Sequence, residues 1–483
     1  MPYQKFTKDV GLIGLTNLLI GLEGLIILPI ITKLLGPENY GIWAQIMVTL
    51  SLATPILTLG LPFTLIRFLA AEKNKKEIQE GIYSVLSVVF IAGAIASLFL
   101  IIFSNPISNF LGISNPILIK ILALVILLDC LNLVFHGVLR AFQKIKTYSF
   151  FAIFKAFGEV GLIIGAISLG YGLLEAIIAL LIVRLIIFLT LGGLIIKRIG
   201  LKLPNFSRIK EYLSFGMPTI ASNISYWIIQ LSDRYLIGYF WGVLYVGYYA
   251  SAYAFGDIII FFIAPLTFIL LPVLSKFFDE NKILAVKNYL KHSLKYFLMI
   301  AIPSTFGISI LSKQLLTIFS TSEIALNAYF ITPLVALSML LYGISAIINQ
   351  IIILLKKTKT AGIIWMGAAL INLGLNFIFI PKFGILSAAI TTLIAYTFGF
   401  ILTWCYAFKD FRFEIDWEFI LKSIFASILM TVFIIWFTPV GLLKTITAII
   451  LGAILYGILI FLFKGFNKKE IEFLKEFFRK TSI

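Results

Sequence analysis

The residues of this chain that could do chemistry are ionisable side chains inside long apolar stretches. One stretch carries Asp129, Asn132, His136 and Arg140, spaced by three, four and four positions. This spacing places the four side chains on one face of a helix. A charged group costs free energy inside a bilayer, so each is expected to face a partner, a polar cavity or a substrate. The stripe predicts a polar path from the middle of a helix to one of its ends.

Other ionisable side chains lie in neighbouring apolar stretches. Cations there suit an anionic substrate such as a phosphate, and carboxylates can balance them. Two simpler interpretations stay open: Lys155 and Glu159, four positions apart, could neutralise each other, and Arg67 and Arg140 could extend to the membrane surface. The candidates for substrate binding are Glu23, Arg67, Asp129, Arg140, Lys155, Glu159, Arg184 and Arg234.

No catalytic or metal-binding arrangement is expected. The chain has only two histidines, His136 and His292, and neither a phosphate-cradling glycine loop nor a metal-ligand spacing is found in the sequence. The two cysteines, Cys130 and Cys405, lie in apolar stretches and are predicted to be small buried thiols. The sequence therefore favours a transporter over an enzyme.

Composition indicates the elements that must position these residues. The 483 residues are 61% hydrophobic and only 13% charged, and the mean hydropathy is +1.06. Soluble domains carry about 25% charged residues. Many apolar stretches are long enough to cross a hydrocarbon core of about 30 Å. The predicted fold is an all-α integral membrane protein with about 14 transmembrane helices.

The predicted spans follow the apolar stretches and are separated by short polar connections. Prolines inside several of them predict kinks. The predicted ranges are 10–35, 40–70, 80–104, 115–140, 147–170, 173–197, 211–239, 244–275, 288–312, 326–355, 359–380, 384–408, 418–438 and 441–463.

The net charge of +17 comes from lysines and arginines that gather in alternate connections. This distribution follows the positive-inside rule and predicts that both termini are cytoplasmic, in a cell (plasma or inner) membrane. It also argues against a nucleic-acid partner and favours anionic lipids and an anionic substrate. The few basic residues predicted on the outer side are Lys33, Lys120, Lys313, Lys382 and Lys444.

Two similar hairpins predict a duplicated unit. Residues 36–41 run from Gly36 to Gly41 between apolar stretches, and residues 242–247 run from Gly242 to Gly247 in the same setting. Six spans followed by six in the same orientation predict two lobes that face each other across a polar cleft. The predicted parts are an N-lobe (1–200), a C-lobe (201–410), two extra C-terminal helices (411–464) and a cytoplasmic amphipathic tail (465–483).

Three stretches carry a resemblance to a known family: 35–41 (LGPENYG), 233–238 with 246–249, and 380–389. They resemble the polysaccharide-biosynthesis flippases, of O-antigen type, in the multidrug/oligosaccharidyl-lipid/polysaccharide exporter superfamily. The resemblance covers essentially the whole chain. It implies an alternating-access flippase that moves polyprenyl-(pyro)phosphate-linked oligosaccharide from the cytoplasmic to the outer leaflet, with the cations above as pyrophosphate partners. Glycan polymerases or glycosyltransferases are the implied protein partners.

The resemblance also implies a coupling-cation site. In the related lipid II flippases a sodium site is formed by three spans, and the matching positions here are Asp233, Asn372, Asn376 and Thr392. Asn376 stands where that family has a second carboxylate, which lowers the charge of the site. The alternative is that the two asparagines join helices by hydrogen bonds. Na+ or H+ is the expected coupling ion, and no other cofactor is expected.

Three other functions stay open. A cation-coupled multidrug exporter of the same superfamily could use Glu23 and Asp129 for coupling. A lipid II flippase is a further alternative within the superfamily. A membrane-embedded glycan polymerase or ligase is more distant, because it would need reactive groups on a sizeable outer loop and the outer connections are short.

Overall fold

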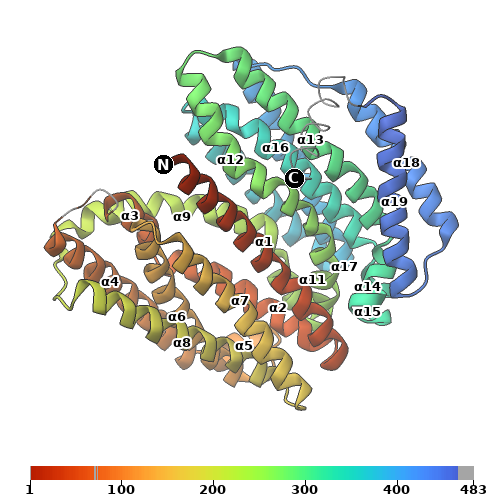
Figure 1. The fold of residues 1–483 in the computed structure, drawn as a ribbon. Helices are drawn as coiled ribbons and strands as arrows, with labels where there is room; N and C mark the ends of the chain where they lie inside the picture. The colour runs from red at the N-terminus through yellow and green to blue at the C-terminus, as the bar shows by residue number, and fades with distance from the viewer. Residues whose placement is uncertain (1, 70–71, 73, 466–483) are drawn as a thin grey trace. The chain divides into compact units, whose positions relative to one another are not determined.

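The computed structural model describes residues 2–69, 72 and 74–465, and all regular secondary structure in these residues is helical (Figure 1). The helices are α1 (Pro2–Leu34), α2 (Pro37–Leu57), α3 (Leu61–Leu69), α4 (Lys75–Ile102), α5 (Ser104–Phe110), α6 (Pro116–Ala141), α7 (Ile145–Ser168), α8 (Leu173–Ile199), η1 (Phe206–Arg208), α9 (Ile209–Leu231), α10 (Asp233–Trp241), α11 (Val243–Gly256), η2 (Asp257–Ile259), α12 (Ile260–Asp279), α13 (Ile283–Ile310), α14 (Ser312–Phe319), α15 (Ser322–Ala328), α16 (Ile331–Leu354), α17 (Thr358–Asp410), α18 (Trp417–Phe437) and α19 (Leu442–Leu462).

Local sequence explains where the helices begin. Pro37 opens α2 directly after Gly36, which has a φ of 89°. At the start of α6, the Asn115 side chain accepts a hydrogen bond from the backbone N–H of Ile117, and Pro116 takes the first helical position. These are the residue types that satisfy or avoid unpaired N–H groups at a helix start.

Twelve helices in the described part of the chain are long and apolar enough to cross a membrane. This confirms the multi-pass helical class. The 53-residue α17 enters this set as one helix, although Gly384 inside it has non-helical backbone (φ 63°, ψ −148°). The segment of α9 and α10, predicted as one span, is not in the set. The count of 14 therefore stays a prediction.

Three predicted spans are interrupted. The span predicted at 40–70 consists of α2 and α3, because Leu59 and Gly60 between them have positive φ. A Cβ atom on Gly60 would lie 2.2 Å from the backbone oxygen of Gly216 in α9, so this break brings two backbones into contact. The span at 211–239 is divided into α9 and α10, and the span at 244–275 is divided by η2.

The helices group into two units. Unit 1 contains residues 1–250 and 369–388. Within it, α6 packs against α3, α4 and α8, and α7 packs against α1 and α8 (Figure 1). The central helix α6 is thereby surrounded by helices, which is why the polar face of α6 can avoid lipid.

The two predicted hairpins contact each other inside unit 1. A Cβ atom on Gly41 would lie 1.8 Å from the backbone oxygen of Val243, and one on Gly247 would lie 2.1 Å from that of Pro37. Only glycine permits such an approach of two helix backbones. The two similar sequences thus form one crossing of α2 with α11.

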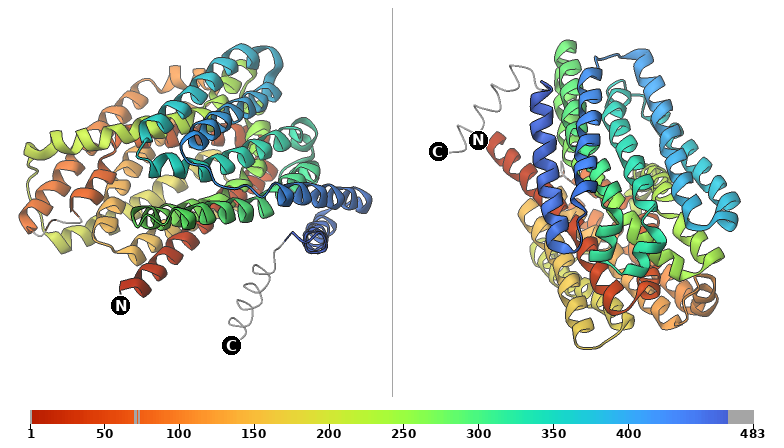
Figure 2. Two further views of the ribbon diagram at one scale, coloured as in Figure 1. Left: turned by 90° about the horizontal axis from the view of Figure 1, so that it is seen from above. Right: turned by 90° about the vertical axis from the view of Figure 1, so that its right-hand side faces the viewer.

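Unit 2 contains residues 251–368 and 389–483. Its helix α13 packs against α12, α16 and α18, and α18 packs against α19; Figure 2 shows α18 and α19 as neighbours. The connection before α18 lies along α13. The Nζ atom of Lys291 is 2.7 Å from a Glu414 carboxylate oxygen, and that of Lys295 is 3.2 Å from an Asp416 oxygen.

The predicted lobes and tail are not tested by this packing. Unit 1 extends beyond residue 200 and includes 369–388, but the lobes were defined by the repeat, so their boundaries stay a prediction. The amphipathic tail (465–483) lies outside the described residues except for Gly465.

Of the two cysteines, Cys130 is buried as predicted and Cys405 is exposed. The prediction for Cys405 is wrong, because the outer face of a membrane helix meets hydrocarbon and an apolar thiol needs no burial there.

Candidate functional site

A cluster of charged side chains lies between helices α6, α7 and α8. The guanidinium of Arg184 is central: its Nη1 atom is 2.8 Å from Glu159 Oε1, and its Nε atom is 3.0 Å from Asp129 Oδ1. The Arg184 and Glu159 side chains are only 3% and 2% exposed. Since a buried charge is tolerated only when it is paired, this arrangement satisfies Arg184 with two carboxylates.

Lys155 joins this cluster from the more open side. Its Nζ atom is 2.8 Å from the same Oδ1 atom of Asp129, and its side chain is 34% exposed. The ion pairs therefore run between helices, and the alternative that Lys155 pairs with Glu159 along one helix is not the arrangement found. Because α7 packs against both α6 and α8, each member can reach a partner on another helix.

Neutral groups support the cluster. The Asn132 side-chain amide donates a hydrogen bond to the backbone oxygen of Arg184 at 2.9 Å. The Thr54 hydroxyl donates to Asp129 Oδ2 at 3.4 Å, and Arg184 also donates to the backbone oxygen of Leu180 at 3.3 Å. These contacts hold the charged groups in place on three helices.

A cavity of about 410 Å³ lies beside the cluster, entirely within unit 1. Helices α1, α2, α3, α6, α7 and α9 contribute to its wall. Its charged and titratable lining residues are Glu23, His136, Arg140, Tyr148 and Lys155, and Thr58 and Thr219 add hydroxyl groups. Two cations against one acid make the wall suitable for an anion. We call it the cationic cavity.

The cavity divides the predicted substrate residues into groups. Glu23, Arg140 and Lys155 line it. Asp129, Glu159 and Arg184 lie behind the wall and connect to it through Lys155. Arg67 is exposed on α3 and is not a lining residue, although its neighbour Ile66 is. The polar stripe of α6 therefore has a buried half, at Asp129 and Asn132, and a cavity half, at His136 and Arg140.

The remaining predicted residues lie elsewhere. Arg234 is paired with Asp233, with 3.1 Å between Nη1 and Oδ1, and the Tyr249 hydroxyl also contacts the Asp233 carboxylate. The Asn376 side-chain amide donates to Asn372 Oδ1 at 3.1 Å. Thr392 is assigned to unit 2, and Asp233, Asn372 and Asn376 are assigned to unit 1. The coupling-cation site stays a prediction. Separately, no group of three or more His, Cys, Asp or Glu side chains among the described residues could hold a metal ion.

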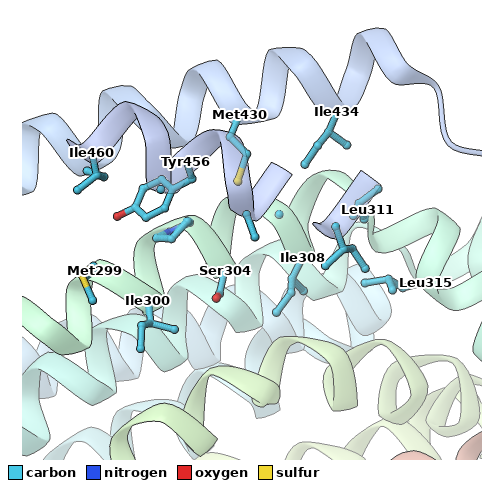
Figure 3. Close-up of a pocket in the computed structure, with 15 residues that line it drawn as sticks. Met299, Ile300, Ser304, Ile308, Leu311, Leu315, Met430, Ile434, Tyr456 and Ile460 are labelled. Atoms are coloured by element: carbon cyan, nitrogen blue, oxygen red, sulfur yellow. The ribbon is translucent and has the colours of Figure 1, made fainter. Parts of the chain in front are cut away.

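A second cavity, of about 440 Å³, lies in unit 2 (Figure 3). Met430 and Ile434 of α18 and Tyr456 and Ile460 of α19 face the residues of α13 across it. Its wall is apolar except for hydroxyl groups such as that of Ser304. It suits hydrocarbon and presents no charge to an anion, so the cationic cavity is the better candidate for polar chemistry.

Sequence reasoning missed the hydroxyl groups of the cationic cavity, those of Thr58, Tyr148 and Thr219. Thr58 follows the end of α2 and Thr219 lies on α9, so the two come together only through the Gly60–Gly216 contact. Tyr148 packs its ring against His136 at a centroid distance of 5.3 Å. Threonine and tyrosine are common in membrane helices, so their type alone carried no signal.

Comparison with solved structures identifies the fold. A lipid II flippase, MurJ, in an inward closed conformation matches with a TM-score of 0.80 at 20% identity, over 93% of this chain and 98% of that chain. An inward-facing multidrug resistance MATE family transporter of the MOP superfamily matches with a TM-score of 0.67 at 16% identity, over 82% and 98%. The chain therefore shares the fold of these two membrane proteins.

Comparison of sequences identifies the family. The chain belongs to the polysaccharide biosynthesis protein family, whose model matches residues 30–325. A Haloferax volcanii protein named as a probable low-salt glycan biosynthesis flippase, Agl15, is 25% identical over 74% of this chain and 77% of its own length. A Shigella flexneri protein whose name is "Putative O-antigen transporter" is 24% identical over 77% of this chain and 90% of its own length.

Proposed function

We propose that this protein is a flippase that moves a polyprenyl-(pyro)phosphate-linked oligosaccharide from the cytoplasmic to the outer leaflet for surface polysaccharide or glycan assembly. The single observation that carries the proposal is the cationic cavity, which offers Arg140 and Lys155 within a bundle of apolar helices. Family membership and the names of the relatives support the same substrate class.

The cavity supplies what the lipid headgroup needs. A pyrophosphate with attached sugars will not enter hydrocarbon unless other groups replace its hydration. A guanidinium can bind two phosphate oxygens at once, and an ammonium adds a compact positive charge. Hydroxyl groups of Thr58, Tyr148 and Thr219 can hydrogen-bond to phosphate or sugar oxygens.

The membrane potential helps this transport. With the inside negative, moving one negative charge outward is favoured by about 2.3 kcal/mol per 100 mV. In the proposed orientation, with both termini on the cytoplasmic side of a cell membrane, the same potential favours the return of the empty cationic cavity to the inward-facing state.

Coupling to Na+ or H+ at Asp233, Asn372, Asn376 and Thr392 is a separate part of the proposal, supported by the resemblance and by the buried carboxylate of Asp233.

A transport assay with purified protein tests the proposal. Proteoliposomes carrying the protein and a polyprenyl-pyrophosphate-linked glycan in the inner leaflet should move the glycan outward, where an external lectin can bind it. We expect Arg140→Ala and Lys155→Ala to slow this movement. Equal rates with and without protein would contradict the flippase.

The same vesicles test the alternatives. Uptake or release of a cationic dye, driven by a sodium or proton gradient, would favour the multidrug exporter; Arg140 and Lys155 argue against it, because they repel a cation. Elongation of the glycan would indicate the polymerase or ligase.

A further inference from the structure

We propose that Lys155 changes its partner when an anion binds: its ammonium group leaves Asp129, joins Arg140 on the same phosphate-type headgroup, and returns to Asp129 when the headgroup leaves. Asp129 is then a positioning residue that holds Lys155 in the empty cavity and so weakens anion binding. This inference rests on the proposed function, because it takes the cationic cavity to be an anion site. It adds an exchange of ion pairs that the transport proposal does not require.

The charges of the empty cavity leave little attraction for an anion until Lys155 is released. On the cavity wall, the charge of Arg140 is balanced by that of Glu23. The third charged lining residue, Lys155, already has Asp129 as its partner, with 2.8 Å between Nζ and Oδ1. An arriving anion therefore competes with the Asp129 carboxylate for the Lys155 ammonium.

Helix geometry separates the two cations in the empty state. The positions of Asp129 and Arg140 on α6 are about 16 Å apart along the helix axis. Since the Lys155 ammonium contacts Asp129, it lies at the end of this stretch that is remote from Arg140. A headgroup bound by Arg140 can contact Lys155 closely only if the ammonium moves along α6 toward Arg140.

The direction of α7 favours this movement. Helix α7 begins at Ile145, after the short connection that follows the Arg140 end of α6. Because side chains on a helix lean toward its N-terminus, Lys155 can turn from Asp129 toward Arg140. Ala152, one turn nearer to that end, also lines the cavity, and its methyl group leaves room for the flexible lysine side chain.

Asp129 keeps other partners when Lys155 leaves. Its carboxylate accepts a hydrogen bond from Arg184 Nε at 3.0 Å and one from the Thr54 hydroxyl at 3.4 Å. The Arg184 side chain is buried and also contacts Glu159, whereas Lys155 is partly exposed. Since an accessible ion pair costs less to break than a buried one, Lys155 is the cation of this cluster that can be exchanged.

Calorimetry of the full-length protein in lipid nanodiscs tests the exchange. The probe is symmetrical dimethyl pyrophosphate, a diester whose charge does not change near neutral pH. Asp129→Asn keeps the size of the side chain but removes the charge that holds Lys155. The Kd should therefore fall by about fivefold, the upper end for an accessible ion pair. Glu38→Gln, at an exposed glutamate outside the cavity, is the control and should bind the probe as wild type does.

Further variants show whether Asp129 acts through Lys155. Lys155→Met should weaken binding, and Asp129→Asn added to it should give no tightening, because no ammonium is left to release. This double variant keeps the balanced pair of Arg184 with Glu159. Glu159→Gln removes the same charge from a carboxylate that pairs with Arg184, and it should tighten binding less than Asp129→Asn does.

A measurement on the wild-type protein covers the case in which Asp129→Asn does not fold. The infrared band of a carboxylate depends on its ion-pair partners, so saturating probe should shift a carboxylate band of the wild-type protein. The same shift should appear in Glu38→Gln. It should be absent from Lys155→Met, in which Asp129 has no ammonium partner to lose.

The outcomes separate this inference from the proposed function. A Kd that is unchanged or higher in Asp129→Asn, equal tightening in Glu159→Gln, or tightening that persists in the double variant would each overturn the exchange and leave the anion cavity intact. An unshifted carboxylate band in wild type would do the same. Failure of wild-type protein to bind the probe, or binding unchanged by Arg140→Ala, would overturn the anion cavity and with it this inference.

Discussion

Lys155 and Asp129 form an ion pair between α7 and α6, with 2.8 Å between Nζ and Oδ1, at the boundary between a buried charge cluster and the cationic cavity. Asp129 also accepts a hydrogen bond from Arg184 at 3.0 Å. The Asp129 carboxylate therefore pairs both with Arg184, which is buried, and with Lys155, which lines the cavity. Arg184 and Asp129 act as positioning residues for Lys155.

Removing the shared carboxylate should destabilise unit 1. Asp129→Ala leaves Arg184 and Lys155 short of a partner in a buried setting, and breaking a buried pair in this way costs about 3–5 kcal/mol. Thermal unfolding in detergent should show a clear fall in the midpoint. Glu280→Gln breaks the exposed pair of Glu280 with Lys282, where the side chains are 37% and 59% exposed, and should leave the midpoint unchanged. Equal midpoints for both variants would contradict the structural role of Asp129.

Arg67 and Arg140 are both exposed but should differ in their effect on substrate binding. Arg140 lines the cationic cavity and Arg67 does not. A hydrogen bond to a charged group contributes about 1.5–3 kcal/mol, so Arg140→Ala should weaken binding of a pyrophosphate diester by about 10–100-fold. Arg67→Ala should change it less than threefold, within the range of a surface charge. Binding calorimetry of both variants checks this, and an equal loss in both would place Arg67 on the substrate path as well.

The helix crossing at Gly41 should not tolerate a side chain. In Gly41→Ala the new methyl group would lie 1.8 Å from the backbone oxygen of Val243, so α2 and α11 must separate. Overpacking of this kind costs about 1–3 kcal/mol, and the unfolding midpoint should fall. Gly161→Ala is the control, because no atom lies within 4 Å of its Cβ position. That variant should be neutral or more stable by up to about 1 kcal/mol, the helix preference of alanine over glycine.

Stability should fall in acid through Asp416, which caps α18. Partial burial opposes ionisation of Asp416, but the backbone N–H of Phe419 and the Lys295 ammonium outweigh it and hold the pKa of this carboxyl below its ordinary value of 3.8. A carboxyl with a lowered folded-state pKa stabilises the fold above its unfolded pKa, and that contribution disappears as the pH falls through the folded value. The stabilisation is thus present above about pH 4 and lost below it.

The variant Asp416→Asn checks this origin. Asparagine keeps the helix cap, which contributes about 1 kcal/mol, but cannot titrate. Unfolding midpoints of wild type and Asp416→Asn should differ at neutral pH and converge in acid. A constant difference between pH 7 and 3 would show that the charge of Asp416 contributes nothing.

Part of the site was predictable because a helix imposes its own geometry. The spacing of Asp129, Asn132, His136 and Arg140 predicted one polar face, and the structure places these residues along one side of α6, from the cluster to the cavity. The pairing of Lys155 was not predictable. A contact along one helix can be inferred from the sequence, whereas the Asp129 partner depends on how α6 and α7 pack.

The membrane class was determined by the sequence alone, because a bilayer imposes requirements of length and apolarity that can be counted. The two glycine hairpins likewise indicated a duplication, since turns and close approaches depend on residue type. Only the tertiary structure decided that the two hairpins cross and that Arg184 is buried between two carboxylates. It also decided that Arg140 lines a cavity and Arg67 does not. These relations depend on contacts between helices that are distant in sequence. The residue pattern of one helix does not show which other helices pack against it.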